Sequence, residues 1–146
     1  MAGRILALDV GTKTIGVAVS DELGIIAQGL TTIRRRDEQT DLDQVAAIVD
    51  EYQVKEVVVG LPFNMDGSIG PSARLVLALV EQLISRLTVP VETWDERWTT
   101  MAAERTLIEA DVRREKRRKV IDKVAATFIL QGYLDAAANR NRDKER

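Results

Sequence analysis

The sequence predicts an α/β protein built on a five-stranded mixed sheet that is flanked by helices. Three short apolar or β-branched runs near the N-terminus are joined by brief turns, and two later strands each follow an amphipathic helix. Short links join antiparallel neighbours, whereas a helical crossover returns the chain parallel to an earlier strand. The order β-β-β-α-β-α-β-α-α therefore predicts an antiparallel three-strand meander plus two parallel strands.

The strands are predicted from apolar runs that are bounded by turn residues. The meander strands are expected at residues 5–10, 14–20 and 26–33, and the crossover strands at 54–61 and 89–94. If the first strand is central and parallel to the last two, the C-terminal ends of these three strands share one edge. Ligands of open α/β sheets bind along that edge.

The helices are predicted from apolar residues that recur at helical spacing. We expect them at residues 40–53, 71–87, 100–110 and 120–138, with Pro71 in a first turn and Thr100 as an N-cap. One domain over residues 1–138 accounts for these elements. Residues 139–146 (NRNRDKER) are expected to form a polar C-terminal tail.

The composition restricts the chemistry that the chain can perform. A chain of 146 residues, with 45% hydrophobic and 30% charged residues, is typical of one globular domain. The absence of Cys and His excludes ordinary zinc sites, thiol nucleophiles and Ser-His-Asp triads. Catalysis must then depend on carboxylates, Lys, Tyr, hydroxyl groups or a bound ion. No apolar run approaches the roughly 18 residues of a membrane span and no signal peptide is evident, so we expect a cytoplasmic protein.

Acidic residues follow the strands that end at the shared edge. Asp9 ends the first strand, Asp95 and Glu96 follow the fifth, and Asp122 lies near the start of the last helix. Carboxylates that converge repel one another, and a bound Mg²⁺ or Mn²⁺ would relieve that repulsion. Each acid also has an ordinary structural explanation. In the order given, these are a turn former, an Asx cap, an ion-pair partner for Arg97 and a charge that favours the start of a helix. Both interpretations stay open on this pattern.

Basic residues are concentrated in two places despite a formal net charge of -2 and an isoelectric point near 5.3. The stretch 113–119 holds six basic residues in seven, and Arg34, Arg35 and Arg36 form a second cluster. Such patches are compatible with local binding of a polyanion. On charge alone, two solvated loops are the preferred interpretation.

Four motifs, in order along almost the whole chain, resemble the bacterial Holliday-junction-resolvase-like family, also called the pre-16S rRNA nuclease family. The motifs are LALDVGTKTIGVAVSD, VVVGLPFNMDGSIG, WDERWTT and VIDKVAATFILQGYLD. The resemblance implies a ribonuclease-H-like fold and hydrolysis of phosphodiester bonds that depends on Mg²⁺ or Mn²⁺, with two ions when substrate is bound. It also implies a role in trimming the 5′ end of precursor 16S rRNA during ribosome biogenesis.

The resemblance places the family's acidic motifs on Asp9, Asp95-Glu96-Arg97 and Asp122. We expect Asp9, Glu96 and Asp122 to be the catalytic metal ligands. Asp95 is a weaker candidate, because adjacent strand residues point to opposite faces. The residue after Arg97 is usually leucine in the family, and here it is Trp98. Trp98 is expected either to be buried or to provide a surface on which a nucleic-acid base stacks.

Nucleic acid is the expected partner, in the form of structured precursor rRNA or branched DNA, with the small ribosomal subunit as a further candidate. No membrane partner is expected, and the chain is expected to be a monomer or a weak homodimer. The basic stretch is interpreted as a clamp on the nucleic-acid backbone. The expected nucleic-acid contacts are Lys13, Asn64, Arg97, Arg113, Arg114, Lys116, Arg117, Arg118 and Lys119.

Three alternative functions remain at this point. A resolvase acting on branched DNA would use the same metal chemistry as a ribonuclease. A non-catalytic RNA-binding assembly factor could use the acids to hold a structural ion. An ATPase or sugar kinase also opens with Asp-x-Gly-Thr, but those proteins need two lobes around a nucleotide, and this chain has length for only one.

Overall fold

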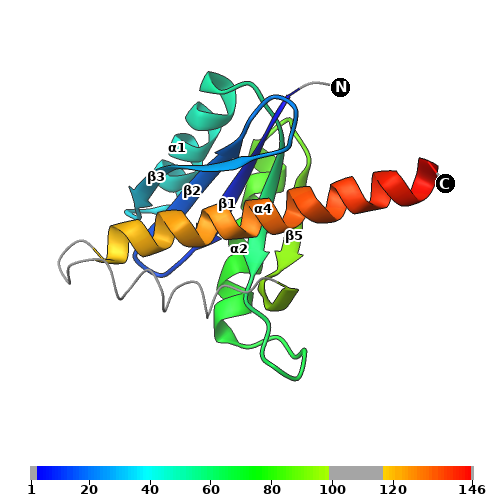
Figure 1. Ribbon diagram of the computed structural model, residues 1–146. Coiled ribbons are helices and arrows are strands. Elements are labelled where there is room, and N and C mark those ends of the chain that lie inside the picture. The colour runs from blue at the N-terminus through cyan, green and yellow to red at the C-terminus, as the bar shows by residue number, and fades with distance from the viewer. Residues whose placement is uncertain (1–2, 99–116, 146) are drawn as a thin grey trace.

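The computed structural model describes residues 3–98 and 117–145, and these form a five-stranded sheet with helices on both faces (Figure 1). The first strands are joined directly, and the later ones are separated by helices. In chain order the elements are β1 (Arg4–Val10), β2 (Thr14–Ser20), β3 (Ala27–Arg34), α1 (Glu38–Glu51), β4 (Val54–Leu61), α2 (Pro71–Arg86), β5 (Val91–Asp95), the 3-10 helix η1 (Glu96–Trp98) and α4 (Arg117–Glu145).

The sheet has the strand order β3-β2-β1-β4-β5. The pairs β1–β2 and β2–β3 are antiparallel, and the pairs β1–β4 and β4–β5 are parallel. This is the predicted meander with two parallel strands added at its β1 side. The C-terminal ends of β1, β4 and β5 share one edge with the start of β2 and the end of β3.

The two faces of the sheet are covered by different helices (Figure 1). Alternate residues of β1 divide between two cores: Leu6 and Leu8 pack with residues of α1 and α2, and Ile5 and Ala7 pack with residues of α4. Helix α4 runs across the strands. Small residues on that face, such as Ala7 and Ala18, permit its close approach.

Local interactions fix the ends and the attachment of the helices. Asp37 caps α1, because its carboxylate accepts a hydrogen bond from the Thr40 backbone N–H at 2.8 Å. The Tyr133 hydroxyl of α4 donates to the Glu56 carboxylate of β4, and its ring meets Trp94 edge to face at 5.8 Å. The part of the chain that the structure describes contains no helix with the length and apolarity of a membrane span.

Most predicted element bounds agree with the structure to within about two residues. The last helix is the exception, because it continues to Glu145 where we expected its end at residue 138. Residues 139–145 of the expected polar tail are therefore helical. The structure adds η1, which the sequence reasoning missed, and the expected helix at 100–110 lies outside the described residues.

Candidate metal and nucleic-acid site

Asp9 lies at the end of β1, on the side of the sheet that α4 covers. Strand residues alternate between faces, and Ile5 and Ala7 both pack in the core beneath α4. Asp9 is the next residue on that side of β1, and its partner on the neighbouring strand β2 is Gly16. The Asp9 residue is half-buried, at the edge of the sheet where this core ends.

Glu96 reaches the same face from the other side of the sheet. A Cβ atom added at Gly60 of β4 would lie 2.7 Å from Glu96 Oε1 and 2.5 Å from Ile129 Cδ1 of α4. The Glu96 carboxylate therefore lies over Gly60, in space that any larger residue would occupy. The β1–β4 ladder pairs Leu8 with Val59, so Asp9 and Gly60 lie one residue beyond that pair on adjacent strands. Asp9 and Glu96 thus share one face and one edge of the sheet.

Asp122 belongs to α4, the helix that packs on this face. The buried residues Ala125, Ala126 and Ile129 show which stripe of α4 faces the sheet, and Asp122 lies one helical turn before them. The Asp122 side chain lies outside the described part of the structure. Within the described side chains, no group of three or more acids forms a metal-binding cluster. The three-carboxylate site therefore stays a prediction.

Asp95 has a different environment from Glu96. It pairs with Leu61 on the α1 and α2 side of the sheet and is only 6% exposed. Both of its carboxylate oxygens accept hydrogen bonds from the Arg97 guanidinium, at 2.6 Å from Nη2 and 3.0 and 3.1 Å from Nε. These hydrogen bonds hold the pKa of Asp95 below its usual value. Asp95 thus orients Arg97, and of the acids predicted at the strand ends this leaves Asp9 and Glu96 on the α4 side.

Arg97 is held in place by several groups at once. Its guanidinium carbon lies 5.3 Å from the centre of the Phe63 ring, and its Nη1 lies near Gly67. The pKa of Arg97 is raised above its usual value, chiefly by the hydrogen bonds to Asp95 and also by the charges of Asp95 and Asp66. The result is a permanently charged, partly exposed cation directly after Glu96. Such a group suits a phosphate.

The predicted contact residue Asn64 lies in a tight turn between β4 and α2. Its side-chain amide donates to Ser68 Oγ at 2.9 Å, and its backbone carbonyl accepts from the Gly67 N–H at 2.8 Å. Ser68 in turn donates to Asp66, which lowers the pKa of that carboxyl. The exposed Asn64 thus shapes the turn, and its contact with substrate stays a prediction.

A buried ion pair supports the turn that follows Asp9. Arg35 Nε donates to Asp41 Oδ2 at 3.1 Å, and Arg35 Nη1 donates to the Gly11 carbonyl at 3.0 Å. Asp41, which is 2% exposed, also accepts from the Arg36 backbone N–H. The Lys13 side chain is exposed in this turn, and its predicted phosphate contact stays a prediction.

Several predicted contacts lie at the margin of the described structure or beyond it. Residues 113–116 of the basic stretch are outside the described residues, and residues 117–119 begin α4, although their side chains are not described. The backbone of Trp98 ends η1, and its side chain is likewise not described. The proposed clamp therefore stays a prediction.

Comparison with known proteins identifies the family of the chain. Residues 3–136 match the family described as RuvX, Holliday junction resolvase. The chain belongs to this family. A Clostridium botulinum protein (strain Eklund 17B / Type B) named "Putative pre-16S rRNA nuclease" is 54% identical over 132 residues, which are 90% of this chain and 96% of the relative. A Clostridium beijerinckii protein of the same name is 53% identical over 137 residues, which are 94% of this chain and 99% of the relative.

A solved structure extends the comparison to the architecture. The structure of T. thermophilus RuvC in complex with a Holliday junction substrate superimposes with a TM-score of 0.60 and 13% identity, over 92% of this chain and 96% of that one. At that identity the likeness shows the fold alone. The predicted ribonuclease-H-like sheet and the predicted membership of the Holliday-junction-resolvase-like family are both confirmed.

Sequence reasoning missed two residues that shape the site. Gly60 provides the space for the Glu96 carboxylate, and Phe63 provides a surface for Arg97. A glycine within an otherwise continuous run of buried β-branched residues was the available signal for Gly60, since such a glycine often marks a close approach. No comparable signal indicated that Phe63 contacts Arg97.

Proposed function

We propose that this chain is a divalent-metal-dependent nuclease in which Asp9, Glu96 and Asp122 hold the metal. The observation that carries the proposal is the cradle over Gly60, which sets the Glu96 carboxylate on the same face and edge of the sheet as Asp9. Because α4 packs on that face, Asp122 is the acid that its first turns can add. Membership of a family described as a Holliday junction resolvase supports the nuclease assignment.

The donor set fits a hard cation. Carboxylate oxygens are the ligands that Mg²⁺ and Mn²⁺ prefer, and the sequence contains no His or Cys to favour a softer metal. A pair of such ions, when bound, supplies an activated water and stabilises the leaving oxygen of a phosphodiester. The chain's own residues position the substrate. Arg97 neutralises a phosphate beside Glu96, and Asp95 keeps the guanidinium in one orientation.

Precursor 16S rRNA is the substrate that we propose, with 5′-end processing as the biological role. The support is the high identity to relatives that carry the pre-16S rRNA nuclease name over nearly their whole length. The small ribosomal subunit would then be the setting and the cytoplasm the compartment. The family description favours branched DNA as the second candidate substrate. We propose a monomer or weak homodimer as the acting form.

The test is a cleavage assay with three proteins. Wild type, Asp9→Asn and Asp50→Asn are incubated with Mn²⁺ and either 5′-extended small-subunit precursor RNA or a four-way DNA junction, and the cut ends are mapped. Asp50 is an exposed acid near the end of α1 and serves as the matched control. We expect wild type and Asp50→Asn to cut the RNA, and a folded Asp9→Asn or added chelator to abolish cutting. Binding without cutting by wild type would contradict the proposal, and cutting of the junction alone would reassign the substrate.

A further inference from the structure

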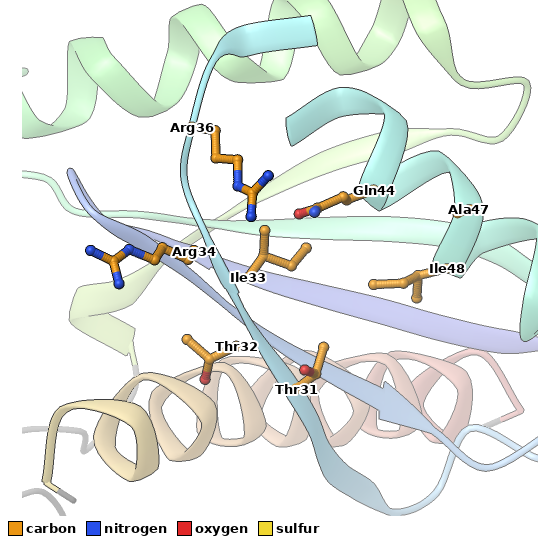
Figure 2. A pocket seen from close by; sticks show the side chains of 8 residues that line it. All are labelled: Thr31, Thr32, Ile33, Arg34, Arg36, Gln44, Ala47 and Ile48. Atoms are coloured by element: carbon orange, nitrogen blue, oxygen red, sulfur yellow. The ribbon is translucent and has the colours of Figure 1, made fainter. Parts of the chain in front are cut away.

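A groove of about 350 Å³ runs between the outer strand β3 and helix α1 (Figure 2). The strand supplies hydroxyl, apolar and basic side chains, the link to α1 supplies a second arginine, and the helix supplies one carboxamide and two apolar residues. The lining residues are Thr31, Thr32, Ile33, Arg34, Arg36, Gln44, Ala47 and Ile48. None of the roles described above uses this groove.

The charge of the groove has one sign. Arg34 and Arg36 are exposed, and no acidic residue lines the groove. Within the described chain, neither guanidinium makes a hydrogen bond or an ion pair, whereas Arg35 between them is fully committed to Asp41 and Gly11. The Arg36 guanidinium and the Gln44 carboxamide point toward one another in Figure 2. Arg34 follows the buried Ile33 and points away from Arg36 and Gln44 in Figure 2, so the two arginines stand on either side of the outer strand, where they can contact successive phosphates.

The acid that follows Arg36 in the sequence has other hydrogen-bond partners. Asp37 follows Arg36, but both of its oxygens accept hydrogen bonds from Thr40, at 2.8 Å from the backbone N–H and 2.9 Å from the hydroxyl. These hydrogen bonds, helped by the charge of Arg36, lower the pKa of Asp37. Asp37 is therefore held by Thr40 as the cap of α1 and makes no described ion pair with Arg36, although its negative charge offsets part of the positive charge beside the groove.

The groove lies toward the same end of the strands as Asp9, but on the α1 side of the sheet, whereas Asp9 lies on the α4 side. Arg34 pairs with Thr14 at the start of β2, and β2 follows the turn after Asp9. Since adjacent strands are about 4.8 Å apart, β3 lies about 10 Å from β1. Arg34 follows the buried Ile33 and so points to the α4 side, and a nucleic-acid strand that leaves the metal site can pass Arg34 and cross the outer strand β3 to reach Arg36.

We propose that the β3–α1 groove is a second phosphate subsite, which holds the sugar–phosphate backbone of the nucleic-acid substrate a few nucleotides from the bond that is cut. This inference rests on the proposed function for its substrate. The phosphodiester backbone is favoured over an acidic peptide because a nucleic-acid strand that leaves the reacting phosphate on the α4 side can cross the outer strand β3, past Arg34, into the groove. Arginine contacts to phosphate position a substrate without reading its sequence.

The test compares two double variants that each remove two positive charges. R34Q/R36Q alters the groove, and R86Q/R140Q is the control, because Arg86 and Arg140 are surface residues outside the groove. Binding of a labelled single-stranded RNA is measured by fluorescence anisotropy in EDTA over a range of salt concentrations, so that no cleavage is needed. Circular dichroism confirms that both variants are folded.

We expect R34Q/R36Q to reduce the slope of log affinity against log salt by about 1.4, and to weaken binding about twentyfold at 0.1 M salt. R86Q/R140Q should leave both quantities near the wild-type values. If R34Q/R36Q had the same affinity and salt slope as wild type, the subsite would be overturned and the nuclease proposal would stand. The same conclusion would follow if the two double variants lost RNA affinity equally. Failure of wild type to bind RNA would also overturn the subsite. A wild type that binds RNA but never cuts it would refute the nuclease proposal alone.

Discussion

Replacing Gly60 with alanine probes the space that Glu96 occupies. The new Cβ atom would lie 2.7 Å from Glu96 Oε1 and 2.5 Å from Ile129 Cδ1, and ordinary contact begins at 3.4 Å. The carboxylate oxygen must therefore retreat by about 0.7 Å, which exceeds the roughly 0.5 Å that a functional constellation tolerates. We expect kcat for RNA cleavage to fall about a hundredfold. The unfolding free energy should fall by only about 1–2 kcal/mol, because the atoms that clash are the ends of side chains.

A second substitution separates the two contacts. Ile129→Val removes the Cδ1 atom and relieves the packing clash, but it leaves the contact between the new methyl group and Glu96. Urea unfolding and single-turnover cleavage are measured for Gly60→Ala, Ile129→Val and the double variant. We expect the double variant to be at least as stable as Gly60→Ala and still slow. Recovery of cleavage in the double variant, or wild-type cleavage by Gly60→Ala alone, would refute the role assigned to this glycine.

Two further predictions concern ionisable groups. Asp95→Asn should lower the unfolding free energy by about 1–2 kcal/mol at pH 7, because a buried acceptor of Arg97 is lost. Since Arg97 lowers the pKa of Asp95 below 3.8, that stabilisation is present above pH 3.8 and disappears as the pH falls through the folded-state pKa. Urea titrations at pH 7 and at the acid limit of folding check this, and an unchanged difference at low pH would contradict it. Burial and the Glu56 contact raise the pKa of Tyr133 above 10.0, so stability should decline as the pH rises beyond 10. Tyr133→Phe should remove that alkaline decline, and a decline that persists would show another group to be responsible.

The sheet was predictable because each strand has a recognisable local sequence pattern. The runs at Thr14–Ser20 and Val54–Leu61 are apolar, β-branched and bounded by turn residues, and both have the predicted bounds in the structure. The end of α4 was not predictable in the same way. The polar residues after position 138 indicate exposure but not a break, since no glycine or proline follows to end the helix.

The acids of the candidate site were predictable, but the separate role of each acid was not. Strand alternation separates Asp95 from Glu96, yet the sequence alone does not show that Asp95 binds Arg97 through both oxygens. That arrangement depends on η1, a single turn without a sequence signal that we recognised. The groove beside β3 also escaped prediction, because it arises from the packing of α1 against an outer strand.

Asp41 links parts of the molecule that would otherwise be treated as separate. Its carboxylate holds the backbone beside one end of the β3–α1 groove through Arg36, and through Arg35 it secures the carbonyl of Gly11 in the turn after Asp9. Loss of this one buried acid would loosen both places together. In a mutational scan, Asp41 would therefore resemble a residue of the reaction centre, although it belongs to a helix on the opposite side of the sheet from the proposed metal. Damage at Asp41 would propagate through the scaffold and would leave every proposed ligand chemically intact.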